Sequence, residues 1–344
     1  MDKEIPAFQR HTVALLLARG PAGRFADLDG LRYKALLPIN GRPLVDHVLT
    51  SLQDSGVEKV FIVQSPDERL QDVLTAHPKN TFIDVEGYPD SLAWSLAKAL
   101  EKLAGCYDAE AFSRLFIMVT PCDIPGVPAG DFNKLISEAL SQDAAIVLVM
   151  APYDLVKGAF PHKTFQKLFH SDVRQAMASQ GIVFASGELL RVKPVEGRDD
   201  FGLEVLDSIG QPVIGLDKMI DVLHKGRHAF WLWPNFIFQV FVRRMIAKGK
   251  GGDAFRLLAD LMMGRITAQK IGNYLFAVFG VRFGVVTTNT ASFSGDIDTY
   301  EDLKLITLPA PSLSSRAGTR GSRVSRVLSL LTDDRCSQGR STCA

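Results

Sequence analysis

The sequence carries almost no net charge. Its 39 lysines and arginines are balanced by 38 aspartates and glutamates, which leaves a formal charge of +1 over 344 residues. Without a surplus of one sign, no overall field attracts the protein to nucleic acid or to an anionic membrane. We therefore expect no stable nucleic-acid complex, and any charged ligand has to be bound by a local cluster of charges.

Cysteines and long apolar runs are also scarce. The four cysteines lack paired C-x-x-C spacing, which argues against a disulfide framework and a zinc site. The most apolar stretch, residues 229–242, is shorter than the ~20 residues of a membrane-spanning helix and contains Pro234. The polar first residues lead into no apolar core of a secretory signal. These absences predict a cytoplasmic protein with reduced thiols and no membrane span.

The sequence does contain an alternating pattern of strands and helices. Apolar residues make up 47% of the chain, enough for a substantial core. Short apolar runs without alternation are typical of strands covered on both faces, and they occur at residues 12–18, 60–63, 115–119, 145–150 and 283–286. Helical patterns lie at residues 44–55, 91–103 and 132–140, the last opened by Asp131. This order predicts an α/β fold with three layers around a mostly parallel, Rossmann-like central sheet.

The middle of the chain is less regular. We predict strands at residues 181–184 and 189–192, a helix at residues 216–224, and helices within residues 235–279 that break at residues 249–252 and at Gly264. Five aromatic residues lie between Trp231 and Phe241. We interpret them as core, although an acceptor pocket or a membrane surface would also use them.

The composition changes sharply towards the C-terminus. Residues 309–344 are rich in serine, glycine and arginine and hold few apolar side chains, so their burial would not offset the entropy of ordering the chain. They predict a disordered basic tail, for which contact with RNA or a membrane is the alternative. We expect one domain over residues 1–308, with the acceptor side at about residues 151–250.

A cationic loop that contains glycine follows the first predicted strand. Residues 19–24 are Arg-Gly-Pro-Ala-Gly-Arg. In open α/β sheets, ligands lie beyond the carboxyl ends of strands, where glycine lets backbone N–H groups approach a phosphate. Arg24, Arg32 and Lys34 add positive charge beside Arg19, and such groups bind phosphate oxygens. The pattern indicates a phosphate site, although glycine spacing alone fits an ordinary solvated loop equally well.

The two segments around this loop, Leu17–Gly20 and Lys34–Leu44, resemble the opening of the MobA-like nucleotidyltransferases. In that family a strand, a glycine-rich loop, an arginine and then Lys-x-Leu-x-x-x-x-Gly-x-Pro-Leu precede a helix. The resemblance implies the fold of the nucleotide-diphospho-sugar transferases, the GT-A type. It also implies that Lys34 contacts the reacting phosphates. The positions that would bind the triphosphate are Ala18, Gly20, Gly23 and Arg24.

Two acidic motifs provide candidate metal ligands. Asp123 directly follows the predicted strand 115–119, where a carboxylate suits Mg²⁺ bound to phosphates, and a plain turn before Pro125 is the alternative. Far downstream, residues 295–303 resemble the closing Asp-x-Asp-x-x-Glu-Asp-Leu motif of the same family. If the first residues of that motif have an extended backbone, the side chains of Asp296 and Asp298 point to the same face, and that of Ile297 to the opposite one. The resemblance implies metal binding by Asp123 and by Asp298, with Asp296 as its neighbour.

Two further segments carry weaker signals. Thr299 and Asp302 have the spacing of an N-cap and the third helical residue, and we predict that they start the last helix. Residues 87–92 resemble the family segment that lines the base and the sugar, which makes Gly87 and Ser91 candidate nucleotide contacts. A simple helix start at this position is an equally good interpretation.

The resemblance implies a Mg²⁺-dependent nucleotidyltransferase with two substrates, a nucleoside triphosphate and a small phosphorylated or hydroxyl acceptor. One departure supports an alternative. Family loops usually begin Ala-Gly-Gly, whereas Arg19 takes the second place here. A nucleotide- or sugar-nucleotide-binding protein of this fold that has lost turnover is therefore the second hypothesis. A glycosyltransferase of similar fold is the third.

Overall fold

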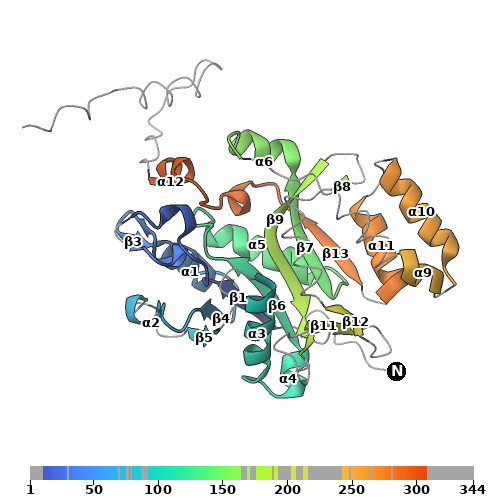
Figure 1. Ribbon diagram of the computed structural model, residues 1–344, viewed down its shortest axis with the longest axis horizontal. Coiled ribbons are helices and arrows are strands. Elements are labelled where there is room, and N and C mark those ends of the chain that lie inside the picture. The colour runs from blue at the N-terminus through green and yellow to red at the C-terminus, as the bar shows by residue number, and fades with distance from the viewer. Residues whose placement is uncertain are drawn as a thin grey trace, which may run out of the picture. The chain divides into compact units, whose positions relative to one another are not determined.

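A mostly parallel β-sheet forms the centre of the molecule, which we describe from a computed structural model (Figure 1). Neighbouring strands follow the order β13-β7-β9-β6-β1-β4-β5, and β8 pairs with β9. Pairs along this order are parallel except those of β9, which runs antiparallel to its neighbours. The strands are β1 (His11–Leu17), β4 (Lys59–Gln64), β5 (Thr81–Asp84), β6 (Leu115–Pro121), β7 (Ile146–Pro152), β8 (Phe169–His170), β9 (Ala176–Ser186) and β13 (Phe283–Thr287). The prediction of a mostly parallel α/β sheet is confirmed.

Not every residue is described by the structure. The described residues are 11–28, 31–68, 70–74, 77, 80–86, 92–163, 169–170, 176–187, 190–192, 203–206, 212–215, 242–247, 249–263, 265, 267–279 and 282–307. They belong to one compact unit, Met1–Thr307. Several predictions lie outside the described residues: the helix at 216–224, the aromatic residues of 231–241, the break at Gly264 and the tail 309–344.

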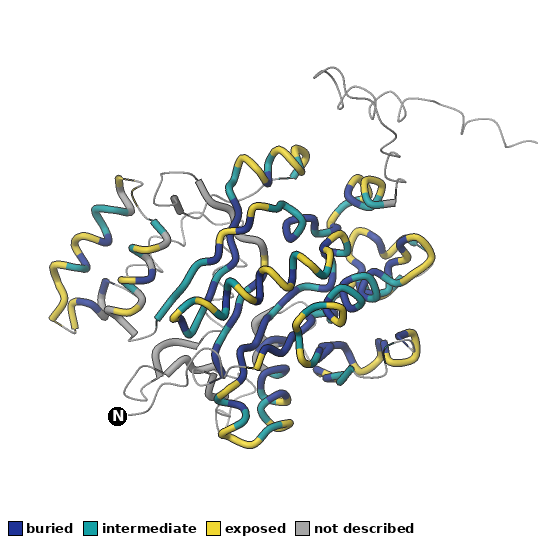
Figure 2. The backbone as a smooth tube through the Cα atoms, turned by 180° about the vertical axis from the view of Figure 1, so that it is seen from behind, coloured by how far each residue is buried: buried dark blue, intermediate teal, exposed yellow. Residues whose placement is uncertain are grey.

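Helices cover both faces of the sheet and complete three layers. Side chains of α1 (Leu44–Gln53) and α5 (Ala129–Leu140) share a core with one face, and those of α3 (Leu92–Ala104) and α4 (Ala109–Ser113) share a core with the other. Alternate residues of β1 point to opposite faces, with Leu16 in the first core and Leu15 in the second. Figure 2 shows the buried residues, in dark blue, concentrated along the central strands. Burial on both faces explains the unbroken apolar runs.

Smaller elements complete the described chain. The remaining helices are α2 (Leu70–Val73), α6 (Tyr153–Ala159), α9 (Arg243–Ala247), α10 (Gly251–Met262), α11 (Ala268–Phe279) and α12 (Tyr300–Thr307). The remaining strands are β2 (Pro38–Ile39) and β3 (Arg42–Pro43), and β10 (Leu190–Val192), β11 (Leu203–Leu206) and β12 (Pro212–Gly215) of a second sheet. In Figure 1, α11 lies beside β13, which it contacts. None of the described helices is long and apolar enough to cross a bilayer.

The structure corrects some predicted boundaries. Asp131 does not open α5, because the helix begins at Ala129 and Pro128 is its N-cap. Asp131 instead lies in the first turn, and its Oδ2 accepts a hydrogen bond from the Ser292 hydroxyl at 2.9 Å. Pro128 is tolerated at the start of α5, because a backbone N–H at that position would have no partner within the helix.

The predicted break at residues 249–252 is shorter than expected, since α10 already begins at Gly251.

A short hairpin leads from the loop region into α1. Strands β2 and β3 pair through Ile39 and Arg42, and the two residues between them, Asn40 and Gly41, have φ angles of 49° and 78°. Two consecutive positive φ angles define a tight type I′ turn, for which Asn-Gly is the preferred sequence. The hairpin therefore fixes the path of the chain between Lys34 and the first helix.

Candidate functional site

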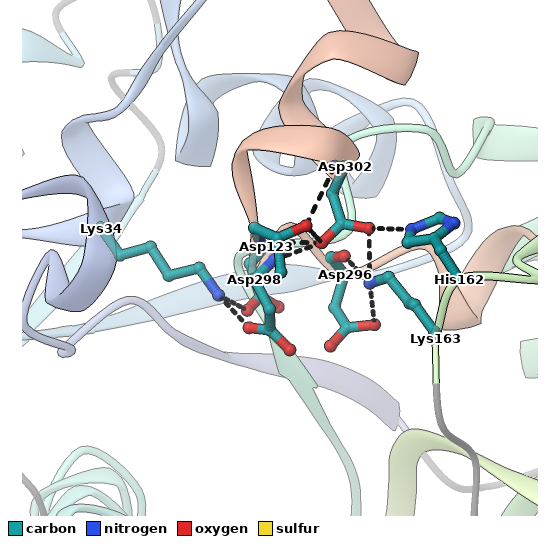
Figure 3. A network of polar contacts seen from close by, with 8 residues as sticks. Lys34, Asp123, His162, Lys163, Asp296, Asp298 and Asp302 are labelled. Atoms are coloured by element: carbon teal, nitrogen blue, oxygen red, sulfur yellow. Dashed lines mark hydrogen bonds and ion pairs between the residues drawn. The ribbon is translucent and has the colours of Figure 1, made fainter. Parts of the chain in front are cut away.

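Lys34 lies between two carboxylates. Its Nζ donates hydrogen bonds to Asp123 Oδ2 at 2.6 Å and to Asp298 Oδ1 at 2.7 Å. Figure 3 shows the lysine approaching both acids from one side. The side chains of Lys34 and Asp123 are 18% exposed, and that of Asp298 is 50% exposed. The structure thus brings three of the sequence-predicted site residues to one point that solvent can reach.

The loop after β1 folds back on itself and places Lys34 there. The Ala22 N–H donates to the Arg32 carbonyl at 2.9 Å, and the Lys34 N–H donates to the Gly20 carbonyl at 3.0 Å. These two bonds close the loop at its base. Lys34 then begins a short 3₁₀ turn, Lys34–Leu36, next to the end of β1. The glycine-containing loop and its lysine are therefore one local unit.

Asp123 and Asp298 meet Lys34 because two other segments end beside β1. Strand β6 pairs with β1, and the Cys122 N–H continues this pairing by donating to the Leu17 carbonyl at 3.2 Å. The Ile297 N–H donates to the Asp123 carbonyl at 3.0 Å. Ile297 is fully buried in a small core with Phe25, Leu37 and Leu44. This core fixes the C-terminal acidic loop against the N-terminal loop region.

Mutual attraction keeps these groups charged despite burial. Burial would lower the pKa of Lys34, but Asp123 and Asp298 raise it above its usual range. Burial would likewise raise the pKa of Asp298, but a hydrogen bond with Asp296 and the Lys34 ammonium hold it well below its usual range. Near neutral pH, Lys34 is therefore a cation and Asp298 an anion.

Asp296 differs from Asp298 although the two acids lie side by side. Burial raises the pKa of Asp296 to about 6, and the hydrogen bond with Asp298 and repulsion by Asp123 act in the same direction. The predicted alternation is confirmed, since Ile297 faces the core while both neighbouring acids hydrogen-bond each other. Asp298 is thus the stronger candidate metal ligand, and Asp296 is a neighbouring acid that retains a proton more easily.

Two residues that the sequence does not predict hold the acidic loop from the side opposite Lys34 (Figure 3). The Lys163 ammonium donates to the carbonyl of Asp296 and to its Oδ1, the latter at 2.9 Å, and lies 3.4 Å from Asp302 Oδ1. His162 Nε2 lies 2.6 Å from the same Asp302 oxygen. These residues follow α6 in a stretch without a recognisable motif, so no sequence signal marks them. Only the tertiary structure places them at the site.

Asp302 and Thr299 cap helix α12 as the sequence predicts. Asp302 Oδ2 accepts hydrogen bonds from the N–H groups of Thr299 at 2.8 Å and Asp298 at 3.0 Å. In return the Asp302 N–H donates to the Thr299 hydroxyl at 3.2 Å. This reciprocal pair is a capping arrangement. It fixes the backbone on which Asp298 is carried.

The predicted phosphate-loop residues have different environments. Gly23 has a φ of +57°, a conformation that glycine adopts at little cost. Ala18 is buried, and its N–H donates to the Val63 carbonyl at 3.0 Å within the sheet. Arg24 is exposed and forms no ion pair within the described part of the chain. Arg24 therefore does not join the cluster around Lys34, and Gly87 and Ser91 lie outside the described residues.

A cavity of about 490 Å³ opens on the other side of the glycine-containing loop. Residues 19–21, 32–33, 65–67 and 85–86 line it, so it lies beyond the carboxyl ends of β1, β4 and β5. Ligands of open α/β sheets bind at this edge. The loop after β1 borders both the cavity, through Gly20, and the carboxylate cluster, through Lys34. The two regions are thus suited to the two ends of one elongated ligand.

Asp123 and Asp298 provide carboxylate oxygens, the ligand type that Mg²⁺ prefers. Within the described residues, no three His, Cys, Asp or Glu side chains are arranged to enclose a metal ion. Mg²⁺ does not require such an enclosure, because it usually takes one or two carboxylates together with substrate phosphates and water. Asp123 and Asp298 already converge on one cation, the Lys34 ammonium. These two residues fit Mg²⁺ that arrives with a polyphosphate.

Comparisons with known proteins identify relatives of this chain. Residues 14–221 match the profile of the MobA-like NTP transferase domain. A molybdenum cofactor guanylyltransferase of Albidiferax ferrireducens is 30% identical over 149 residues, 43% of this chain and 62% of that protein. The bifunctional protein GlmU of Methanocaldococcus jannaschii is 30% identical over 71 residues, 21% of this chain and 17% of that protein. The chain thus spans less than two thirds of each of these relatives.

A solved structure shows the same fold. A hypothetical transferase from Thermus thermophilus superposes with a TM-score of 0.56 at 19% sequence identity. The match covers 86% of this chain and 99% of that chain. At this level of sequence identity, the similarity shows a shared fold and no more.

Proposed function

Because the chain belongs to the MobA-like NTP transferase domain family, we propose that it transfers a nucleoside monophosphate group from a nucleoside triphosphate to a small acceptor. The acceptor carries a phosphate or a hydroxyl group, and pyrophosphate is released. The observation that carries this proposal is the convergence of Lys34, Asp123 and Asp298 beside the glycine-containing loop. The relative named a guanylyltransferase supports the reaction class.

The reaction needs little covalent chemistry from the protein. An acceptor oxygen attacks the α-phosphorus and forms a new P–O bond. The bond between the α-phosphorus and the oxygen that bridges to the β-phosphorus breaks, and that oxygen leaves with the electron pair as part of pyrophosphate. An anionic phosphate acceptor has no proton to lose, whereas a hydroxyl acceptor would release its proton to solvent as the P–O bond forms. Positioning and charge stabilisation therefore supply most of the rate enhancement.

The residues of the site have distinct roles in this proposal. The Lys34 ammonium offsets the negative charge that develops on the phosphate oxygens. Arg24, exposed on the loop, reaches the triphosphate from solvent, and the backbone at Gly20 and Gly23 leaves space for phosphates. Asp123 and Asp298 would hold Mg²⁺, with Asp296 beside them. Bound Mg²⁺ neutralises phosphate charge and withdraws electron density from the reacting phosphorus.

The cavity beyond β1, β4 and β5 holds the nucleoside in this proposal. Pro21, Tyr33 and Val85 provide apolar surface there, and the loop between Gly20 and Lys34 leads from the cavity to the carboxylates. Gly87 and Ser91, which lie outside the described residues, stay candidate contacts predicted from the sequence. The acceptor would approach from residues 151–250, where Lys163 already reaches the acidic loop.

Substrate-dependent stabilisation and pyrophosphate release test the proposal together. We expect at least one nucleoside triphosphate with Mg²⁺ to raise the melting temperature, since a ligand at 100 times its Kd stabilises a protein by about 2.7 kcal/mol. Incubation of that triphosphate with a panel of phosphorylated and hydroxyl acceptors should release pyrophosphate. Binding without release across the panel would favour the alternative of a protein that has lost turnover.

Matched variants separate the site from general effects of charge. Asp123→Asn and Lys34→Met should each abolish pyrophosphate release and weaken the nucleotide-induced shift. Asp143→Asn and Lys134→Met are the controls, because those side chains form exposed surface pairs with Arg282 and Glu138. Equal loss in the control variants, or full activity in Asp123→Asn, would contradict the proposed site.

A further inference from the structure

Arg19 is fixed in the wall of the cavity by two hydroxyl groups. Its Nε donates to Ser65 Oγ at 3.3 Å, and its Nη1 donates to Ser95 Oγ at 2.7 Å. Ser65 directly follows β4 and Ser95 lies on α3, so the guanidinium group is anchored to two elements. Both serines are buried. An arginine held in this way has lost much of its rotational freedom before any ligand binds.

The rest of the cavity suits a flat heteroaromatic ring. Pro21, Tyr33 and Val85 line it with apolar surface. A hydrogen bond with Asp67 holds the Tyr33 hydroxyl, and the Arg32 guanidinium lies 5.6 Å from the centre of the Tyr33 ring. Ligand sites typically combine mostly apolar walls with a few fixed polar groups that determine orientation. Arg19 is such a group here.

The arginine is also an addition relative to the family pattern. Glycine usually occupies this position in MobA-like loops, where no side chain is available to contact a ligand. The structure directs the Arg19 side chain towards Ser65 and Ser95, away from the Lys34 side of the loop. The Arg19 side chain therefore belongs to the cavity and not to the cluster around Lys34.

We propose that Arg19 selects the nucleobase by donating a hydrogen bond to a carbonyl oxygen of the base. This inference rests on the proposed function, because it takes the nucleoside to occupy the cavity. A guanidinium group has only donors, so it requires an acceptor on the ligand. Guanine, cytosine and uracil each carry a carbonyl oxygen. Adenine carries none, because its exocyclic group is an amine donor and its acceptors are ring nitrogens. The site should therefore favour one of those three bases over adenine.

Affinities for four nucleotides test this selection. Titration calorimetry on the full chain would give Kd values for GTP, CTP, UTP and ATP, each with Mg²⁺. We expect wild type to bind one of the first three about tenfold or more tightly than ATP. Arg19→Ala should bring that ratio close to one. Arg19→Lys should also lose most of the preference, because an ammonium group does not reproduce the planar guanidinium that Ser65 and Ser95 hold in place.

Arg32→Ala is the matched control. Arg32 lines the same cavity, but its guanidinium pairs with Asp67 at 3.0 Å and is largely exposed. The preference over ATP should persist in this variant even if the affinities for all four nucleotides fall. A thermal melt without ligand checks that each variant is folded, and Arg19→Gln replaces Arg19→Ala if the latter is not.

The possible results separate this inference from the proposed function. If no nucleotide binds to wild type, the proposed function fails. If nucleotides bind but the preference persists in every folded Arg19 variant, or ATP binds most tightly, only the selection by Arg19 is overturned. If Arg19→Ala weakens the binding of inorganic triphosphate and all four nucleotides equally, Arg19 binds phosphate and the inference is likewise overturned.

Discussion

Glu68 carries a buried carboxyl group. It directly follows Asp67, which lines the cavity. Its Oε2 accepts a hydrogen bond from the Ser65 N–H at 3.1 Å, whereas its Oε1 has no partner within the described part of the chain. Burial raises the pKa of Glu68 to about 8, although the Ser65 N–H and Arg19 act in the opposite direction. Folding therefore favours the protonated form.

This pKa predicts how stability changes with pH. Between the usual pKa of a glutamate, near 4.5, and about 8, the unfolded chain has lost this proton and the folded chain retains it. The contribution of Glu68 to the free energy of unfolding therefore falls as the pH rises through this window. Glu68→Gln cannot ionise, so its melting temperature should rise relative to wild type from pH 5 to pH 8.5.

Thermal melts across this pH range check the effect. Glu138→Gln is the control, since Glu138 is a surface residue that pairs with Lys134 on the same helix. A constant difference between Glu68→Gln and wild type at all pH values would contradict the raised pKa.

Lys163 is predicted to position the acidic loop without contacting the nucleotide. Lys163→Met removes the ammonium group shared by Asp296 and Asp302, so the loop that carries Asp298 should lose its fixed geometry. Loss of one partner from a charged hydrogen bond costs about 1–3 kcal/mol. The Mg²⁺ concentration needed for half of the nucleotide-induced melting shift should rise several-fold, and Lys163→Arg should restore part of it. A lower melting temperature with an unchanged Mg²⁺ requirement would indicate a structural role only.

At the scale of elements, the start of helix α12 carries the acidic loop. Thr299→Ala removes the hydroxyl that accepts the Asp302 N–H, and loss of such a cap costs about 1 kcal/mol. Thr299→Ser keeps the hydroxyl and should retain most of the stability. Urea unfolding of both variants measures the difference. Equal stability of Thr299→Ala and wild type would argue against the capping arrangement.

The elements also show what the sequence could predict. Apolar runs in the sequence predicted β1, β4, β6, β7 and β13. The central strands β1, β4 and β6 are buried on both faces, so their apolar residues form unbroken runs. The antiparallel insertion of β9 was not predicted, since pairing direction depends on where the chain returns. Strand β5 was also missed, although Phe82 and Ile83 form a short apolar pair. The start of α5 was predicted too late, because acidic residues such as Asp131 occur both at N-caps and in first turns.

Part of the site could also be predicted from the sequence, because local sequence determines where some of its residues lie. The motifs that contain Lys34, Asp123 and Asp298 lie at strand ends or helix starts, where the local sequence constrains the backbone geometry. His162 and Lys163 lie after the end of α6, at neither a strand end nor a helix start, and their contacts join positions far apart in the chain. Contacts of this kind depend on tertiary structure, so a single sequence gives no sign of them.

At the scale of the whole molecule, residues from both ends of the described chain build one site. The small core of Phe25, Leu37, Leu44 and Ile297 joins the N-terminal loop to the C-terminal acidic loop. Lys34 then connects Asp123, at the end of β6, with Asp298, before α12. A metal-bound polyphosphate at this point would contact both ends of the described chain at once. The two acids should therefore act on binding as one unit.

A double-mutant cycle measures this coupling most directly. Calorimetry would give the Kd of the preferred nucleoside triphosphate with Mg²⁺ for wild type, Asp123→Asn, Asp298→Asn and the double variant. We predict that each single change weakens binding by about 2 kcal/mol or more and that the double change weakens it little further, because both acids serve one ion. Unchanged affinity in the single variants, or losses that simply add, would contradict a shared site.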